Sequence, residues 1–230
     1  MQNFDAIRGG LIVSCQAEGD DPFNRPELLA LFARAAAMGG AVGLRACGGE
    51  NITAIRAAVD LPVIGITKSM FSDGSVLITA DFADVGGLID AGAQIIALDA
   101  TQRVRPNGLA GCDFLQAVKQ QHDVAVMADV ATLDEGIAAG EAGADFVAPT
   151  LAGHTPYCPP SSDGEPNWAL VEGLVKASAV PVIMEGGIWT TAQACRAVDL
   201  GVFAVVVGTA ITRPRLVTRT FVKAIAGHSR

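Results

Sequence analysis

The stretch AGAQIIAL, residues 91–98, returns almost unchanged as AGADFVAP at residues 142–149. In both copies a glycine stands where a helix would end, small or polar residues follow, and an apolar run begins. This order is typical of a helix that stops at a C′ glycine and leads directly into a buried strand. LGVFAVVV, residues 200–207, is a third copy. The repeat predicts parallel strands that alternate with helices.

Outward from these copies, the chain shows a regular series of apolar runs that read as buried strands. They cover residues 11–17, 41–46, 61–68, 93–101, 123–130, 144–151, 180–187 and 203–211. Segments with helical spacing lie between or after them, at residues 26–40, 51–59, 81–92, 113–121, 132–143, 167–178, 191–201 and 215–227. Candidate N-caps are Asn51, Asp81, Asp113 and Thr132, and candidate C′ glycines are Gly39, Gly92, Gly143 and Gly201.

Eight βα units with short links predict an α/β fold, a (β/α)8 barrel, with residues 1–230 as one domain. The alternative is an open, doubly wound sheet. A dinucleotide-binding sheet of that kind carries G-x-G-x-x-G in its first βα turn, and this chain has none there. The longest irregular stretches, residues 68–80 and 152–166, follow the third and sixth strands, so a barrel would place both on its active-site face.

The composition narrows the class of protein. Half of the 230 residues are hydrophobic, and the net charge is −8 without a basic run, which argues against a nucleic-acid or anionic-membrane surface. No apolar run is long enough for a membrane span and no signal segment opens the chain, so we expect a cytoplasmic protein. Five scattered cysteines and three distant histidines predict reduced thiols and no metal site.

Polar side chains stand at the carboxyl end of every predicted strand, where barrels of this kind carry their chemistry. They are Gln16, Arg45, Lys68, Asp99, Asp129, Thr150, Glu185 and Thr209. One such residue alone is more often a solvated rim residue. Eight at the same end of successive strands predict a functional site.

Two glycine turns near the end of the chain suggest a phosphate site. EGGIWTTAQ, residues 185–193, leads to a helix capped by Thr190 or Thr191, and GTAITRP, residues 208–214, leads toward another helix. Backbone N–H groups of such loops hold phosphate beside a helix N-terminus, and Arg213 would add a bidentate partner. The simpler reading is that these glycines only permit tight turns.

Lys68 closes the run LPVIGITK, residues 61–68. A lysine in a partly dry pocket loses some preference for its charged form, and it then forms a Schiff base with a carbonyl or removes a neighbouring proton. Glu185 comes from the seventh strand, across the barrel and beside the expected phosphate loop. The pair suggests aldose–ketose, epimerase or aldolase chemistry on a sugar phosphate, and the residues alone do not choose among these.

The chain resembles the bacterial N-acetylmannosamine-6-phosphate 2-epimerases over essentially its whole length. The matching stretches are LIVSCQA (11–17), GLRA (43–46), RAAVDLPVIGITK (56–68), IIALDAT (95–101), MADV (127–130), PTLAGHT (149–155), EGGI (185–188) and VVVGTAITRP (205–214). The phrases VSCQA, ALDAT and VVVGTAITRP are fairly specific to that family among phosphate-binding barrels. The resemblance implies a TIM barrel of the ribulose-phosphate-binding type.

It also implies the reaction, which interconverts N-acetylmannosamine 6-phosphate and N-acetylglucosamine 6-phosphate by loss and return of the C2 proton, in sialic acid and amino sugar catabolism. By resemblance, Lys68 is the base at C2 and Glu185 its partner acid/base. Further residues carried over are Gln16, Arg45 and Asp129 for substrate contact and Gly186, Gly187, Gly208, Thr209 and Arg213 for the phosphate loops. The family implies no metal, no cofactor and a homodimer.

The chain departs from the family pattern at three places. Glu185-Gly186-Gly187 stands where the family reads E-G-R, and Arg105 is one candidate to replace the missing cation. Residues 152–155 read AGHT for the usual S-G-Y-T, which makes His154 a candidate site residue or a solvated loop histidine. The loop SMFSDGS, residues 69–75, is also altered.

Other functions stay open beside the epimerase. A ribulose-phosphate epimerase would need metal-binding histidines at strand ends, which are missing, and a Schiff-base aldolase would form an adduct at Lys68. A non-catalytic sugar-phosphate binder would have no reason to keep both Lys68 and Glu185. A homodimer would use the apolar positions of the last helix, although a barrel helix shows the same pattern toward its core. These positions are Leu216, Val217, Phe221, Val222 and Ile225.

Overall fold

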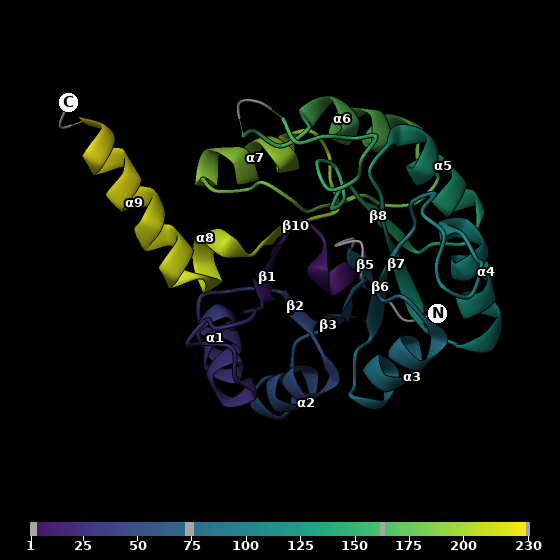
Figure 1. Cartoon of the computed structure of the whole chain (residues 1–230), viewed down its shortest axis with the longest axis horizontal. Coiled ribbons are helices and arrows are strands. Elements are labelled where there is room, and N and C mark those ends of the chain that lie inside the picture. Colours follow the sequence, from purple (N-terminus) through teal and green to yellow (C-terminus); the bar gives the residue numbers. More distant parts are fainter. Residues whose placement is uncertain (1–3, 72–75, 162–163, 229–230) are drawn as a thin grey trace.

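The computed structural model describes residues 4–71, 76–161 and 164–228. Eight parallel strands form one sheet in the order β8-β7-β6-β3-β2-β1-β10-β9. They are β1 (Leu11–Cys15), β2 (Gly43–Cys47), β3 (Val63–Ile66), β6 (Ile95–Asp99), β7 (Ala125–Asp129), β8 (Phe146–Ala148), β9 (Ile183–Met184) and β10 (Ala204–Val207). A parallel bridge between Val147 and Val182 joins the two ends of the sheet. The predicted (β/α)8 barrel is confirmed, with helices around the strands (Figure 1).

The predicted helices are present on the outside of the barrel. They are α1 (Pro26–Met38), α2 (Gly49–Ala58), α3 (Phe82–Asp90), α4 (Gly111–Gln121), α5 (Leu133–Glu141), α6 (Trp168–Ala177) and α7 (Thr191–Asp199). A 3-10 turn, η1 (Asp5–Ile7), precedes β1. The helices begin and end at the predicted N-caps and C′ glycines, except at Asn51, Asp113 and Gly39.

Asp81 and Thr132 are N-caps as predicted, each accepting a backbone N–H from the first turn of its helix. Asn51 and Asp113 are not. Their helices begin two residues earlier, after Gly48 and Ala110, and the Asn51 amide donates instead to the Cys47 carbonyl at 2.7 Å. At the end of α1, Gly40 rather than Gly39 has the positive φ of a C′ glycine, +90°.

The apolar side chains form two concentric layers because successive residues of a strand point to opposite faces. Inside the barrel lie Ile12, Ile64, Ile95, Ile183 and Phe203, among others, with Ile7 of η1 packed against them. The neighbouring residues of the same strands, such as Val63 and Ile96, pack outward against the helices. The interior is therefore a filled core, and the site must lie at its rim.

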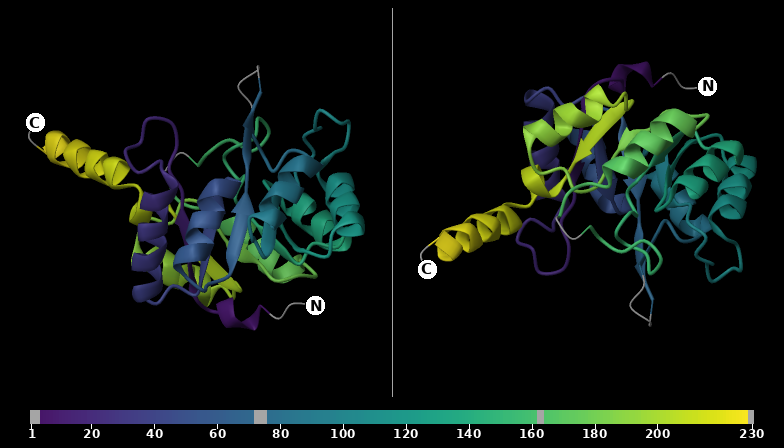
Figure 2. Two further views of the ribbon diagram at one scale, coloured as in Figure 1. Left: turned by 90° about the horizontal axis from the view of Figure 1, so that it is seen from below. Right: turned by 90° about the horizontal axis from the view of Figure 1, so that it is seen from above.

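The predicted strand over residues 61–68 is shorter than expected. β3 ends at Ile66, and Lys68 begins a separate strand, β4 (Lys68–Met70), which pairs antiparallel with β5 (Val76–Ile78). This hairpin stands out from the barrel on the face opposite the N-terminus (Figure 2). It lies within a stretch expected to be irregular, residues 68–80. Most of the altered loop at 69–75 is beyond description, because residues 72–75 lie outside the described ranges.

Thr79 fixes the base of the hairpin. Its φ is +50°, rare for a β-branched residue, and its N–H donates to the Thr67 carbonyl at 3.1 Å. The Thr79 hydroxyl donates to the Ala97 carbonyl of β6 at 2.6 Å and accepts from the Thr67 N–H at 3.3 Å. Lys68 is therefore attached one residue from an anchored point of the barrel.

The last helical segment does not pack on the barrel in the expected way. After α8 (Thr209–Thr212), Arg213 leaves helical geometry with φ −121° and ψ 72°, and α9 (Pro214–His228) starts in a new direction. Pro214 favours this break because it restricts the residue before it. None of the 15 residues described in α9 is buried, and the helix projects from the barrel (Figures 1 and 2).

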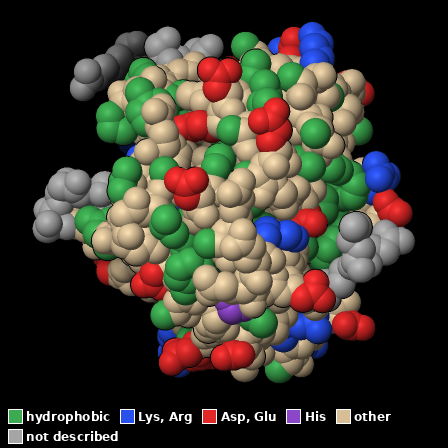
Figure 3. Space-filling view, turned by 90° about the vertical axis from the view of Figure 1, so that its right-hand side faces the viewer, with side chains coloured by type: hydrophobic (Ala, Val, Ile, Leu, Met, Phe, Trp, Pro, Cys, Tyr) green, Lys and Arg blue, Asp and Glu red, His purple; other side chains and the backbone are tan. Residues whose placement is uncertain are grey.

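The surface agrees with the acidic composition. On the side of the barrel that carries α4 and α5, acidic side chains are scattered singly among hydrophobic and polar atoms, and the residues drawn there show no broad cluster of Lys or Arg (Figure 3). No helix within the described ranges is long and apolar enough to cross a membrane.

Candidate active site

A cavity of about 270 Å³ opens at the carboxyl ends of the strands. Eight of the ten predicted site residues line it: Gln16, Lys68, Glu185, Gly186, Gly187, Gly208, Thr209 and Arg213. Six further residues line the cavity: Ser14, Thr150, His154, Ile188, Trp189 and Val206. The sequence had suggested Thr150 and His154 as candidates without giving them a role, and it had not suggested the other four. The structure thus brings together groups that are up to 199 positions apart, from Ser14 to Arg213.

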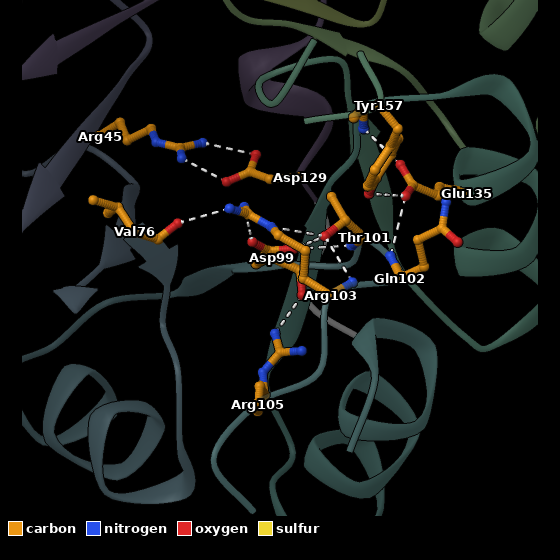
Figure 4. A network of polar contacts seen from close by, with 11 residues as sticks. Arg45, Val76, Asp99, Thr101, Gln102, Arg103, Arg105, Asp129, Glu135 and Tyr157 are labelled. Atoms are coloured by element: carbon orange, nitrogen blue, oxygen red, sulfur yellow. Dashed lines mark hydrogen bonds and ion pairs between the residues drawn. The ribbon is translucent and has the colours of Figure 1, made fainter. Parts of the chain in front are cut away.

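The other two predicted residues, Arg45 and Asp129, lie behind the cavity wall. Their side chains are 1% and 0% exposed, and the Arg45 Nη2 to Asp129 Oδ2 distance is 2.7 Å (Figure 4). Arg45 Nη1 also donates to Glu185 Oε2, and Asp129 accepts the Thr150 hydroxyl at 2.5 Å. Neither residue is among those that line the cavity, so their contact with a substrate stays a prediction. What they do in the structure is hold Glu185 and Thr150 in place.

The environment of Glu185 strongly affects its pKa. Burial raises its pKa, Arg45 lowers it, Asp129 raises it and Lys68 lowers it, and the balance is a pKa of about 7. The side chain is 13% exposed, on the side that faces the cavity. At neutral pH the protonated and ionised forms of Glu185 are therefore both populated, as an acid/base that works in two directions requires.

Lys68 faces the same cavity from the start of β4. Its ammonium forms an ion pair with Glu18, from the loop after β1, and the same Glu18 oxygen accepts from Arg213 Nη2 at 3.2 Å. The side chains of Lys68 and Arg213 are 33% and 21% exposed. Glu18 was missed by the sequence analysis, because a charged residue in a loop is usually solvated. Its only signal was its place two residues beyond Gln16.

Both predicted phosphate loops line the cavity. Gly186 and Gly187 have φ values of +108° and +71°, which L side chains rarely adopt, so this turn depends on glycine. At Gly208 a Cβ would come 3.1 Å from the Ser14 Cβ, so glycine lets β10 end close to β1. Both glycine turns and Arg213 therefore line the cavity. Two carboxyl groups lie near them, Glu185 in the cavity lining and Glu18 in contact with Arg213.

The helix after the first of these loops begins with a capping box. The Thr190 hydroxyl accepts from the Gln193 N–H at 3.2 Å, and the Gln193 side chain accepts from the Thr190 N–H at 3.0 Å. Thr190, and not Thr191, is the cap. The box fixes the direction in which α7 leaves the glycine turn.

Arg105 does not replace the arginine that the family pattern places at position 187. Its side chain is buried under the barrel rim, where it donates to the Asp99 carbonyl and lies 4.2 Å over the Phe114 ring (Figure 4). It is not among the cavity-lining residues. That alternative is wrong, because the strand-end carbonyl and the aromatic ring already hold the guanidinium.

Asp99, another polar strand end, also serves the framework. It accepts from the Thr101 N–H at 2.9 Å and pairs with Arg103, which donates to the Val76 carbonyl of β5 at 3.1 Å (Figure 4). This chain of contacts ties the hairpin that carries Lys68 to the barrel. A strand-end carboxylate is therefore not by itself a site residue.

His154 lines the cavity, as expected if it is a site residue and not a solvated loop histidine. It also borders a second cavity of about 480 Å³ that shares Glu185, Gly186 and Gly187 with the first and is otherwise rich in proline. Within the described ranges no three His, Cys, Asp or Glu side chains are grouped as metal ligands would be.

Comparisons with known proteins identify relatives of this chain. A family model described as "Putative N-acetylmannosamine-6-phosphate epimerase" matches residues 29–227. Proteins named as N-acetylmannosamine-6-phosphate 2-epimerases are 44% identical in Caldanaerobacter subterraneus subsp. tengcongensis, over 96% of this chain and 93% of theirs, and 45% identical in Clostridioides difficile, over 96% and 98%. The solved N-acetylmannosamine-6-phosphate 2-epimerase of Clostridium perfringens has a TM-score of 0.89 at 40% identity, covering 96% of this chain and 95% of that one.

Proposed function

The chain belongs to the N-acetylmannosamine-6-phosphate epimerase family, and from this premise we propose that it interconverts N-acetylmannosamine 6-phosphate and N-acetylglucosamine 6-phosphate. The protein is then an isomerase that acts on a carbohydrate. The observation that carries the proposal is the joint placement of Lys68 and Glu185 on one cavity that two glycine turns and Arg213 also line. A base, an acid and an anion-binding end are the parts that this reaction needs.

Lys68 and Glu185 act as the two proton carriers. With the open-chain sugar bound, the neutral amine of Lys68 removes the C2 proton of N-acetylmannosamine 6-phosphate, and the electron pair of the C–H bond moves into an enolate whose negative charge lies on the aldehyde oxygen. Glu185 then delivers a proton to the other face of C2 and becomes a carboxylate. The return reaction runs through the same groups with roles exchanged, which suits a Glu185 pKa of about 7.

The remaining residues orient the sugar and stabilise charge. Gly186, Gly187, Gly208, Thr209 and Arg213 hold the phosphate through backbone N–H groups and a guanidinium. Gln16, whose amide donates to the Ser14 hydroxyl at 2.7 Å, contacts the sugar beside them. Arg45 and Asp129 act on the substrate through Glu185, whose carboxyl group Arg45 holds. Hydrogen-bond donors beside an oxygen that gains negative charge in the transition state typically lower the activation free energy by several kcal/mol.

The wider setting follows from the family. We propose a cytoplasmic enzyme of sialic acid catabolism that works as a homodimer. The support for the dimer is α9, whose apolar side chains Phe221 and Val222 are 66% and 59% exposed on a helix that projects from the barrel. Burying that face against a second copy would remove it from water.

Proton NMR of the purified protein with either sugar phosphate tests the function. We expect both starting materials to approach the same mixture of the two epimers. Saturable binding without any conversion would contradict the proposal and support a non-catalytic binder. A borohydride-trapped adduct at Lys68, with carbon–carbon cleavage products in place of an epimer, would point to an aldolase instead.

A further inference from the structure

The loop after β1 places one carboxylate between the proposed base and the proposed phosphate-binding arginine. A single oxygen of Glu18, Oε1, pairs with Lys68 Nζ and accepts from Arg213 Nη2 at 3.2 Å. A further ion pair connects the same loop to α9, since Arg215 Nη1 lies 2.8 Å from Asp20 Oδ1. Glu18 is therefore an anion already bound where a phosphate is expected.

Charged and ionisable groups from four parts of the barrel surround Lys68. Glu18 forms an ion pair with Lys68 from the loop after β1, and Glu185 faces it from the end of β9. The charge of Lys68 also acts on the thiol of Cys47, at the end of β2. Arg213, in the turn before α9, is the cation of this group beside Lys68. Partial burial raises the pKa of Glu18, but the hydrogen bonds and charges of Lys68 and Arg213 outweigh it, so the pKa of Glu18 lies below its ordinary value. The two cations thus stabilise the carboxylate form of Glu18.

We propose that Glu18 is a positioning residue that makes the base depend on the substrate's phosphate. In the empty cavity, Glu18 holds Lys68 as an ammonium ion. A phosphate monoester that binds Arg213 displaces the Glu18 carboxylate, because two anions compete for one guanidinium and repel each other. The inference rests on the proposed function, since it assigns Lys68 as the base and Arg213 to the phosphate.

The displacement also changes the state of Lys68. Once its carboxylate partner has moved away, the Lys68 ammonium has lost its ion pair with Glu18. Lys68 then gives one proton to solvent through its exposed side and keeps the electron pair of that N–H bond, which is the pair that attacks the C2 proton. A sugar without phosphate leaves Glu18 in place and meets a lysine that carries no free electron pair.

Glu18→Gln is the direct test, with Asp20→Asn as matched control. Asp20 is in the same loop and pairs with Arg215, and it has no described contact with Lys68 or Arg213. Calorimetry should show that Glu18→Gln binds inorganic phosphate about tenfold more tightly than the wild type does, a difference of about 1.4 kcal/mol. The affinity rises because phosphate no longer competes with a carboxylate for Arg213. The kcat/KM of Glu18→Gln for unphosphorylated N-acetylmannosamine should rise about tenfold, and the alkaline limb of the kcat/KM profile should move about one pH unit lower. The kcat profile with the 6-phosphate should stay unchanged.

Glu18→Asp provides a second variant, whose shorter side chain keeps the charge but withdraws it from both cations, so intermediate shifts are expected. The inference is overturned if Glu18→Gln leaves phosphate affinity and the kcat/KM profile as they are in Asp20→Asn. It is also overturned if the wild type converts the unphosphorylated sugar as well as the 6-phosphate. Conversion of the 6-phosphate by the wild type is measured first, and its absence would refute the proposed function, not the role of Glu18 alone.

Discussion

Glu185 is the site residue whose ionisation makes the stability of the fold depend on pH near neutrality. Its pKa is raised by burial from 4.5 to about 7, so the folded protein binds this proton more tightly than the unfolded chain does. The stabilising effect is complete below pH 4.5 and is lost as the pH rises through 7. Roughly 3 kcal/mol of unfolding free energy, at 1.4 per pH unit, should disappear over that range.

Urea unfolding of the wild type and Glu185→Gln at pH 5 and pH 8 measures this effect. The wild type should lose roughly 3 kcal/mol more than the variant between the two pH values. Equal losses would show that Glu185 titrates in the folded protein as it does in the unfolded chain.

Arg45 carries a second prediction at this scale, because it neutralises two buried carboxyl groups. Arg45→Met should lower the free energy of unfolding by about 3 to 5 kcal/mol, since Asp129 and Glu185 are left buried without their partner. The exposed Arg34→Met on α1 serves as control and should change it by less than about 0.5 kcal/mol. A cost for Arg45→Met as small as that of the control would contradict this role.

The candidate site was predictable residue by residue where strand ends could be located. Polar residues at strand ends pointed to Gln16, Lys68 and Glu185, and the glycine turns pointed to Gly186, Gly187 and Gly208, all of which line the cavity. The sequence does not reveal that Arg45 and Asp129 turn behind the wall, because a strand end looks the same whether its side chain faces the cavity or a neighbouring carboxylate. The place of Glu18 in the site depends on how the loop after β1 folds over the barrel, and the periodicity of apolar residues does not predict loop conformation.

At the scale of elements, α7 gives the clearest test of how a local signal supports the site. Thr190→Ala removes the N-cap of the helix after the Gly186-Gly187 turn and should cost about 1 kcal/mol of unfolding free energy. Thr191→Ala at the next position is the matched control, with an expected cost near zero because alanine is a good helix former. Thermal unfolding compares the two, and equal costs would mean that the cap does not stabilise α7.

Element boundaries were predicted where caps and C′ glycines are unambiguous, as at Thr132 and Gly143. The hairpin of β4 and β5 was not predicted, because its first strand is exposed at Lys68 and Met70 and lacks an apolar face. Its position depends instead on the unusual φ of Thr79 and on Arg103, which are tertiary features. The early start of α4 depends on close packing, since a Cβ at Gly111 would lie 2.3 Å from the Ala100 carbonyl carbon.

For the whole molecule, α9 raises the question of assembly. The apolar residues of the barrel helices pack against the core, and α9 has the same sequence pattern. Only the structure reveals that the apolar face of α9 is exposed. We predict a homodimer by sedimentation. Phe221→Ser combined with Val222→Ser should shift it to monomer, and Arg219→Ser on the same helix should not. A wild-type monomer at micromolar concentration would contradict this prediction.

The central claim is that Lys68 and Glu185 transfer protons on opposite faces of C2, and deuterium NMR in D₂O tests it most directly. The wild type should place deuterium at C2 of each newly formed epimer. Lys68→Ala and Glu185→Gln should each lose epimerisation by about 10² to 10⁴, the usual worth of a proton-transfer group. Glu185→Gln should still exchange the C2 proton of N-acetylmannosamine 6-phosphate, and Lys68→Ala only that of N-acetylglucosamine 6-phosphate. Epimerisation at the wild-type rate by Lys68→Ala, or product without deuterium from the wild type, would contradict the account.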